Sequence, residues 1–349
     1  MKVISVVGAR PQFVKLAPIA RACKDAGIDH VIVHTGQHYD AAMSDVFFED
    51  LTIPAPDVHL GVGSGTHGAQ TGAMLAQLEP VFEAHRPDWV LVYGDTNSTL
   101  AAAVAAVKLH LPLAHLEAGL RSFNRRMPEE HNRVLTDHAA DLLLAPTEVA
   151  RSHLAAEGLS DRTVVVGDVM VDVCYTVRDG LVARDAVSAE SDYFVATIHR
   201  ADNTDDPERL RAIVAALADA PAPVRLLAHP RLRARAEHHG IDLGAGAIEV
   251  HAPLGYPDMV AAVLSSRGVI TDSGGLQKEA YLLDRPCTTL RTETEWVETL
   301  HGGWNVLVDD PAKLGRELRR DVPTEPRIEP YGDGTAAVSA VKELMVRAS

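Results

Sequence analysis

Residues 268–280 read GVITDSGGLQKEA and contain a complete strand–turn–helix unit. The apolar run at 268–271 predicts a short buried strand, and the Gly-Gly pair lets the backbone approach a ligand just before a helix begins. The free N–H groups and the dipole of a helix N-terminus favour an anion such as phosphate. The alternative is an ordinary capped helix with Asp272 or Ser273 as its N-cap. Adjacent glycines are poor helix formers, so we favour phosphate binding.

The same alternation extends along the chain and indicates two parallel sheets. Short runs rich in Val, Ile and Leu predict strands in the first half at residues 3–7, 30–34, 89–93, 113–116, 142–145 and 163–166. A second series is expected at residues 193–198, 224–228, 247–251, 268–271 and 287–290. Helical periodicity predicts helices at residues 14–26, 68–85, 98–109, 147–157, 207–218 and 274–282. The predicted class is therefore α/β.

A chain of 349 residues is long enough for two domains. The best place for a boundary is the segment 171–191, which is helical at first and then charged and small. We therefore expect an N-terminal domain over 1–170 and a second domain over 171–330. Because no long Pro or Gly linker joins them, the two domains are expected to share a tight cleft.

Composition excludes several classes of function. Acidic residues outnumber basic ones by 48 to 33, which gives a net charge of -15 and argues against nucleic-acid binding. The longest uncharged apolar stretch, residues 100–107, is far shorter than the ~20 residues that cross a bilayer, so no membrane partner is expected. Three cysteines without a pairing pattern fit a reducing cytoplasm.

Polar clusters follow the expected strands of the first half at residues 8–11, 34–38, 94–98 and 117–121. Ligands bind outside the carboxyl ends of parallel strands, so these clusters are expected to meet at one edge. Asp95 and Glu117 are the candidates for proton transfer, which needs carboxylates whose pKa values a cleft can shift. Asp95 is alternatively an Asx cap of the next helix. Glu129 and Glu130 are further candidates, and Glu130 also fits as a first-turn helix charge.

Cofactor motifs are weak in this sequence. Residues 63–68 satisfy GxGxxG literally but lack the preceding buried strand of a dinucleotide site, so we expect a loop there. His34 and His38 have the spacing of metal ligands on a helix, but the intervening glycine opposes that helix. We therefore expect neither a dinucleotide cofactor nor a metal. His199 and His229 each follow an expected strand and are predicted to contact a phosphate.

Taken together, ten motifs resemble the non-hydrolysing UDP-N-acetylglucosamine 2-epimerases. In the order of that family, they are GARPQFVKLAP, TGQHYD, VYGDTNSTLAAA, HLEAGLRSFNRRMPEEHNRVLTDH, GDVMVD, ATIHRADN, HPR, PLGYPDM, TDSGGLQKEA and LRTETEWVE. The resemblance implies a GT-B-like fold, with two Rossmann-like domains whose parallel sheets face a central cleft. It also implies that the last helix, near residues 334–347, returns to the N-terminal domain, so that 331–349 joins it. We further expect a homodimer.

The resemblance implies inversion at C2 of a UDP-linked N-acetyl amino sugar by elimination and re-addition of UDP, through a 2-acetamidoglucal and without NAD or metal. A hydrolysing 2-epimerase and a GT-B glycosyltransferase remain alternatives. Position by position, the catalytic set carried over is Asp95, Glu117, Glu129 and His199. In the substrate-binding set, Arg10 and Lys15 are expected near the sugar and diphosphate, and Ser273, Gly274, Gly275 and Glu279 form the UDP segment. His229 is added to this set because it follows an expected strand.

Two motifs depart from the family pattern. An arginine that many members carry after Thr294-Glu295 is replaced by Trp296, so a phosphate contact there would have to come from elsewhere, with Arg291 as the candidate. The effector-site pattern of the bacterial enzymes is altered in GQHYDAAM at residues 36–43, and the basic residue expected near the glycine-rich loop is absent.

Overall fold

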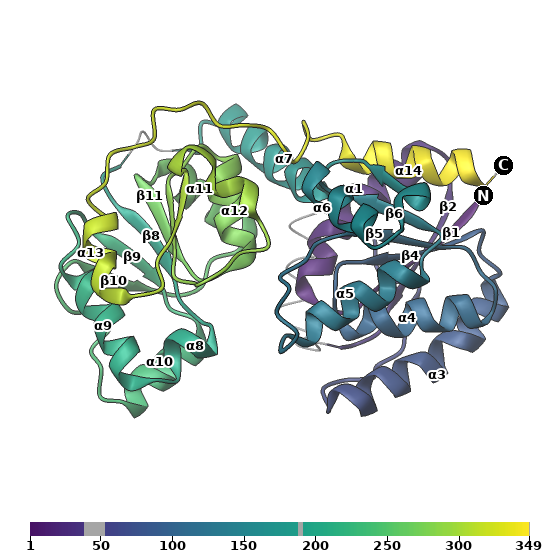
Figure 1. Cartoon of the computed structure of the whole chain (residues 1–349), viewed down its shortest axis with the longest axis horizontal. Coiled ribbons are helices and arrows are strands. Elements are labelled where there is room, and N and C mark those ends of the chain that lie inside the picture. Colours follow the sequence, from purple (N-terminus) through teal and green to yellow (C-terminus); the bar gives the residue numbers. More distant parts are fainter. Residues whose placement is uncertain (38–52, 188–190, 349) are drawn as a thin grey trace. The chain divides into compact units, whose positions relative to one another are not determined.

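The structure is a computed structural model that describes residues 1–37, 53–187 and 191–348, apart from the side chains of Arg10 and Pro11. The chain forms two compact units (Figure 1). One consists of Met1–Thr176 together with Glu329–Ser349, and the other of Val177–Ile328.

The first unit is built on a seven-stranded parallel sheet in the order β3-β2-β1-β4-β5-β6-β7. Its strands are β1 (Lys2–Val7), β2 (Asp29–His34), β3 (Val58–His59), β4 (Trp89–Tyr93), β5 (Leu113–Leu116), β6 (Leu142–Ala145) and β7 (Thr163–Val165). All residues of β4, β5 and β6 are buried, as expected of strands covered on both faces. The strands expected in this half are confirmed, and β3 is a short addition at the edge.

Crossover helices connect these strands: α1 (Arg10–Asp25), α3 (His67–His85), α4 (Asn97–Lys108), α5 (Pro128–Ala139) and α6 (Glu148–Ala156). Two more helices come after β7: α7 (Val169–Ala183), which continues into the second unit, and α14 (Ala336–Arg347). The last of these returns from the end of the chain to pack on α1. Three hydrogen bonds link it to the rest of the unit. The Asp172 carboxylate accepts from the N–H groups of Ala336 and Ala337 at 3.1 and 2.8 Å, and the Trp89 indole donates to the Leu344 carbonyl at 3.1 Å.

The second unit has a six-stranded parallel sheet in the order β10-β9-β8-β11-β12-β13. Its strands are β8 (Phe194–Thr197), β9 (Val224–Leu227), β10 (Ile248–His251), β11 (Gly268–Thr271), β12 (Cys287–Thr289) and β13 (Asn305–Leu307). Its helices are α8 (Ala201–Thr204), α9 (Pro207–Ala218), α10 (Pro230–His238), α11 (Tyr256–Ser265), α12 (Gly274–Leu282) and α13 (Leu314–Glu317). β13, a three-residue strand at the edge of the sheet, was not predicted.

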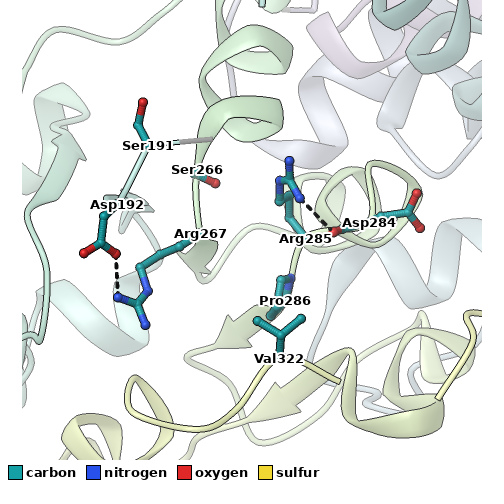
Figure 2. A pocket seen from close by; sticks show the side chains of 8 residues that line it. All are labelled: Ser191, Asp192, Ser266, Arg267, Asp284, Arg285, Pro286 and Val322. Carbon is teal, nitrogen blue, oxygen red and sulfur yellow. Dashed lines mark hydrogen bonds and ion pairs between the residues drawn. The ribbon is translucent and has the colours of Figure 1, made fainter. Parts of the chain in front are cut away.

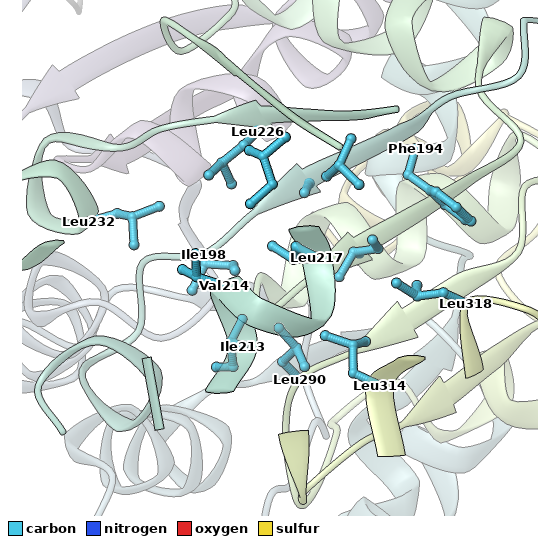
Figure 3. Close-up of a cluster of buried hydrophobic side chains, with 14 of the residues drawn as sticks. Phe194, Ile198, Ile213, Val214, Leu217, Leu226, Leu232, Leu290, Leu314 and Leu318 are labelled. Atoms are coloured by element: carbon cyan, nitrogen blue, oxygen red, sulfur yellow. The ribbon is translucent and has the colours of Figure 1, made fainter. Parts of the chain in front are cut away.

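Figure 3 shows the core that one face of α9 builds in this unit. Leu210, Ile213, Val214 and Leu217 recur at helical spacing and are all buried. They face buried side chains of β8 and β9, with Leu290, Leu314 and Leu318 closing the cluster. Complete burial of an aliphatic side chain stabilises by about 1.5–3 kcal/mol, so this stripe holds the helix against the sheet.

Both units have the strand order of a Rossmann fold, which confirms the expected class of two Rossmann-like parallel-sheet units, of the GT-B-like kind. The order reverses between β1 and β4 in one sheet and between β8 and β11 in the other. At such a point the neighbouring connections leave on opposite faces and open a crevice for ligands. Among the residues described here, no helix is both long and apolar enough to span a membrane.

Candidate active site

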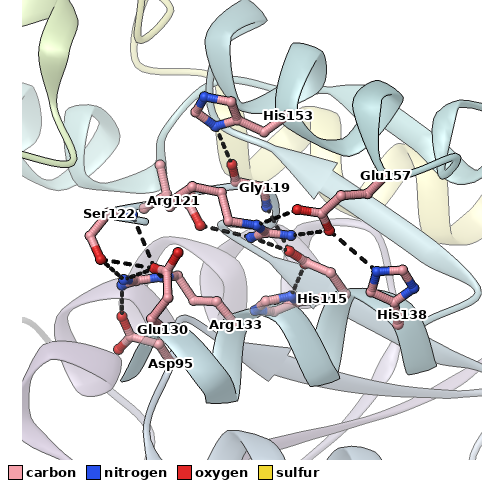
Figure 4. Close-up of polar contacts among 12 residues, drawn as sticks. Asp95, His115, Gly119, Arg121, Ser122, Glu130, Arg133, His138, His153 and Glu157 are labelled. Carbon is pink, nitrogen blue, oxygen red and sulfur yellow. Dashed lines mark hydrogen bonds and ion pairs between the residues drawn. The ribbon is translucent and has the colours of Figure 1, made fainter. Parts of the chain in front are cut away.

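Asp95 lies just beyond β4, at the reversal point of the first sheet, and is paired with a guanidinium. Arg133 of α5 contacts its Oδ2 through Nη1 at 2.6 Å (Figure 4). Burial raises the pKa of Asp95; Arg133 opposes that effect, and the nearby negative charge of Glu117 adds to it. The helix-cap interpretation is not supported, because the Thr96 hydroxyl caps α4 by accepting from the Thr99 N–H. The surroundings of Asp95 therefore raise its affinity for a proton.

Glu117 follows β5 and forms an ion pair with Lys15 of α1. Its backbone has a φ of 71°, in the left-handed region that costs a non-glycine residue roughly 1–2 kcal/mol. The N–H groups of Glu117 and Ala118 both donate to the Leu144 carbonyl and hold this conformation. Burial alone would lower the pKa of Lys15, but pairing with Glu117 outweighs it and raises that pKa. Lys15 is therefore a cation at neutral pH.

Glu130 and Glu129 begin α5 and have different surroundings. The Glu130 carboxylate accepts from the backbone N–H groups of Ser122 and Phe123 at 3.0 and 2.9 Å, and it pairs with Arg133 at 2.6 Å (Figure 4). Glu129 is exposed, and its charge acts on Asp95. Glu130 therefore organises the loop, which leaves Glu129 as the neighbour of Asp95 that is available for chemistry.

In the second unit, Asp272 brings together the segments after β8 and β11. This fully buried carboxylate accepts from the backbone N–H groups of His199 and Arg200, from the Asn203 amide and from His199 Nδ1, the last at 3.0 Å. Burial alone would raise the pKa of Asp272, but the contacts with His199 and Asn203 outweigh it and lower that pKa. With Nδ1 directed at Asp272, His199 presents Nε2 as its second functional atom.

His229 and Ser273 lie at helix N-termini in the same unit. The His229 ring is 5.7 Å from that of His199, and its Nδ1 accepts from the Arg231 N–H. The Ser273 hydroxyl accepts from the Leu276 N–H and caps α12. Arg291 pairs with Glu295 at 3.0 Å. A Cβ at Gly274 would lie 2.6 Å from Glu295 Oε1, so the first turn of α12 packs closely on that acid.

The family model for UDP-N-acetylglucosamine 2-epimerase matches residues 21–345 of the chain. This chain belongs to that family. A Methanocaldococcus jannaschii UDP-N-acetylglucosamine 2-epimerase is 42% identical over 89% of both chains. A Pseudomonas aeruginosa UDP-2,3-diacetamido-2,3-dideoxy-D-glucuronate 2-epimerase is 49% identical over 88% of both chains.

Solved structures of family members have the same fold. The crystal structure of the M. jannaschii 2-epimerase in complex with UDP-GlcNAc and UDP matches with a TM-score of 0.87 at 39% identity, covering 99% of this chain and 100% of that one. The Neisseria meningitidis 2-epimerase bound to UDP-GlcNAc matches with a TM-score of 0.86 at 27% identity, over 99% and 100% of the two chains. A Rickettsia africae glycosyltransferase, with a TM-score of 0.54 at 13% identity, shares the fold alone.

The candidate site residues predicted from the sequence fall into two groups in the structure. The first group lies in the first unit, where contacts and charges couple its members: Asp95, Glu117, Glu129 and Lys15. The second group lies in the second unit and consists of His199, His229, Ser273, Gly274, Gly275 and Glu279. Glu279 is buried on α12. The Arg10 side chain and His38, with the rest of GQHYDAAM after Gln37, lie outside the described residues. Among the residues that are described, no cluster of His, Cys, Asp or Glu is arranged to hold a metal ion.

Sequence reasoning missed two charged partners of the candidate residues, Arg133 and Asp272. Arg133 forms an ion pair with Asp95. Asp272 orients His199 and does not serve as the N-cap of α12, which is Ser273. Arg133 lies one helical turn after Glu129 and Glu130, so the charge pattern of α5 carried a signal that the residues share one face.

A cavity of about 440 Å³ lies elsewhere in the second unit (Figure 2). Its lining residues Asp192, Arg267 and Pro286 precede β8, β11 and β12, so the cavity lies at the amino ends of the strands. Arg267 pairs with Asp192 at 2.6 Å, and Arg285 donates to the Leu264 carbonyl. This cavity is at the opposite end of this sheet from His199 and Ser273, which follow β8 and β11.

Proposed function

We propose that this chain catalyses the reversible C2 epimerisation of UDP-N-acetylglucosamine to UDP-N-acetylmannosamine, by elimination and re-addition of UDP. The observation that carries the proposal is the pair Asp95 and Glu117, two carboxylates at the carboxyl edge of one sheet, each held by its own cation. A carboxyl group with an elevated pKa, beside a second carboxyl group that contacts a lysine, is suited to exchange protons with substrate.

The chemistry requires two stages, because the C2 hydrogen is not α to a carbonyl and is too weakly acidic for direct removal. In the first stage, the C1–O bond breaks with its electron pair leaving on UDP. The positive charge that develops at C1 lets a carboxylate take the proton from C2, and the C–H electron pair forms the C1–C2 double bond. In the second, UDP adds back to C1 while an acid delivers a proton to the other face of C2. We assign these transfers to Asp95, Glu117 and Glu129.

Residues of the second unit are assigned to UDP. Capture of a diphosphate suits the N-terminus of α12, where Ser273, Gly274 and Gly275 lie, and Glu279 has the length to accept from ribose hydroxyls. His199 is oriented by Asp272 and assists the departing phosphate. Arg10, Lys15 and His229 complete the polar set around sugar and diphosphate.

A second candidate substrate is the UDP-linked 2,3-diacetamido-2,3-dideoxyglucuronate. The P. aeruginosa relative named for that sugar is 49% identical, against 42% for the M. jannaschii enzyme named for UDP-N-acetylglucosamine. The reaction at C2 is the same for both sugars, which differ at C3 and C6. The two candidates therefore share the proton-transfer residues and are separated by substrate preference alone.

The test is to incubate the enzyme with each UDP-sugar in D2O and identify the products by NMR. We expect the C2 epimer as a UDP-sugar, with deuterium at C2 and a larger kcat/KM for the true substrate. Accumulation of free UDP and N-acetylmannosamine in equal amounts would identify a hydrolysing enzyme instead. Product that retains its C2 hydrogen completely, or no conversion of either sugar, would contradict the proposal.

A further inference from the structure

His115 is a fully buried polar residue within the otherwise apolar strand β5. Its Nδ1 lies 2.6 Å from Asp137 Oδ1, and its Nε2 lies 2.7 Å from the carbonyl oxygen of Gly94. A carbonyl oxygen can only accept, so Nε2 must carry a proton. A carboxylate also only accepts, so Nδ1 must carry one as well unless the proton resides on Asp137.

The donors that surround Asp137 favour placing that proton on the histidine. Its Oδ2 accepts from Arg121 Nη1 at 2.8 Å and from the Gly119 N–H at 3.1 Å, and two such donors favour the ionised acid. Arg121 is in turn paired through Nε and Nη2 with the two carboxylate oxygens of Glu157, both at 2.8 Å. Glu157 is partly exposed and also has His138 at 3.3 Å, whereas Asp137 is completely buried. A positive charge on His115 therefore adds to that of Arg121 in stabilising the buried Asp137 carboxylate.

The two ends of this network reach the loops that carry the proposed proton-transfer residues. His115 Nε2 donates to the carbonyl of Gly94, which immediately precedes Asp95. Asp137 accepts a hydrogen bond from the N–H of Gly119, which lies two residues after Glu117. Glu117 has a strained backbone with a φ of 71°, and such conformations persist only where neighbouring contacts over-determine them.

We propose that His115 is a positioning residue: a buried imidazolium that, with Asp137, fixes the loops of Asp95 and Glu117 relative to one another. It is completely buried and bonded at both ring nitrogens, so it acts through these loops and not on substrate directly. Its effect on catalysis rests on the proposed function, because it acts through Asp95 and Glu117. Small displacements of reacting groups cost large factors in rate, so the arrangement matters for turnover rather than for binding of UDP.

The protonation state is tested without substrate. In protein labelled with ¹⁵N at histidine, His115 is assigned by comparison with His115→Gln, and both its ring nitrogens are expected to show bonded protons at neutral pH. Asp137→Asn should remove one of them, because the amide can donate to Nδ1 while Nε2–H still reaches Gly94. A single ring N–H in the wild-type protein would overturn the imidazolium.

The positioning role is tested with two amide replacements of different length. In His115→Gln, the side-chain amide occupies the position of Nε2, so this variant keeps the contact with Gly94 and loses the one with Asp137. In His115→Asn, the shorter amide occupies the position of Nδ1, so this variant keeps the contact with Asp137 and loses the one with Gly94. We expect His115→Asn to lower kcat by about tenfold or more with KM changed less than about twofold, and His115→Gln to retain more of the wild-type kcat.

Trp89→Phe is the matched control, since it removes another buried hydrogen bond of the same unit at the opposite end of β4. It should lower the melting temperature and leave kcat unchanged. Equal turnover in the two His115 variants, or a greater loss in His115→Gln, would overturn the positioning role. If the wild-type enzyme converts neither UDP-sugar, the proposed function fails, while the ring N–H count still decides the state of His115.

Discussion

Asp95 and Glu130 contact the same guanidinium, that of Arg133, and yet their surroundings set them apart. Burial alone would raise the pKa of Glu130, but backbone N–H groups of the Ser122 loop and Arg133 outweigh it and lower that pKa. Asp95 accepts from Arg133 and, since burial outweighs that contact, its pKa is raised. One carboxyl group is therefore fixed as a structural anion, and the other is able to change its protonation during a reaction.

Asp95→Asn is expected to lower kcat by about 10²-fold or more, the range for loss of a general acid or base, with nearly unchanged affinity for UDP. Glu279→Gln should do the opposite, weakening UDP binding through loss of a charge-assisted ribose contact. Steady-state kinetics and calorimetric titration with UDP would measure the two effects. Wild-type turnover in Asp95→Asn would show that Asp95 is only a structural partner of Arg133.

At the scale of elements, the connection after β5 depends on a close approach to α6. Gly119 has a φ of 84°, and a Cβ there would lie 2.4 Å from the carbonyl oxygen of Ala150. Neither the backbone conformation nor the space admits a side chain. This single glycine allows the loop that carries Glu117 to lie against the helix.

Gly119→Ala is therefore expected to reduce the free energy of unfolding by more than about 2 kcal/mol, because a helix must move or a loop must distort. Gly65→Ala is the matched control, since a Cβ there meets no atom within 4 Å. Thermal and urea denaturation of both variants would measure the difference. Similar stability of the two variants would contradict the close packing of Gly119.

At the scale of the whole chain, α14 joins the last residues to the unit formed by the first ones. Asp172 caps its N-terminus, and burial raises the pKa of this carboxyl group to about 6. The unfolded chain keeps the ordinary value near 3.9, so between about pH 4 and pH 6 the folded protein binds the proton more tightly. The contribution of Asp172 to the free energy of unfolding therefore falls as the pH rises through this window.

Asp172→Asn should remove that dependence, which amounts to at most about 3 kcal/mol for a shift of this size. The measurement is urea denaturation between pH 4 and pH 7, followed by the fluorescence of Trp89, which contacts α14. Trp296 and Trp304 are replaced by Phe in both proteins, so that Trp89 alone reports. If the free energy of unfolding changed with pH in the same way in both proteins, Asp172 would not titrate in this range.

The sequence by itself determined the class of fold, the strands of both sheets except the short β3 and β13, and the family, because buried strands and glycine turns are local patterns. It also placed Asp95, Glu117 and Ser273 after strands, where parallel sheets bind ligands. Only the tertiary structure decided which charged residues pair: Arg133 with Asp95, Lys15 with Glu117, and Asp272 with His199. These partners are separated by 38, 102 and 73 positions, and ion pairing depends on distance in space, for which a linear pattern carries no signal.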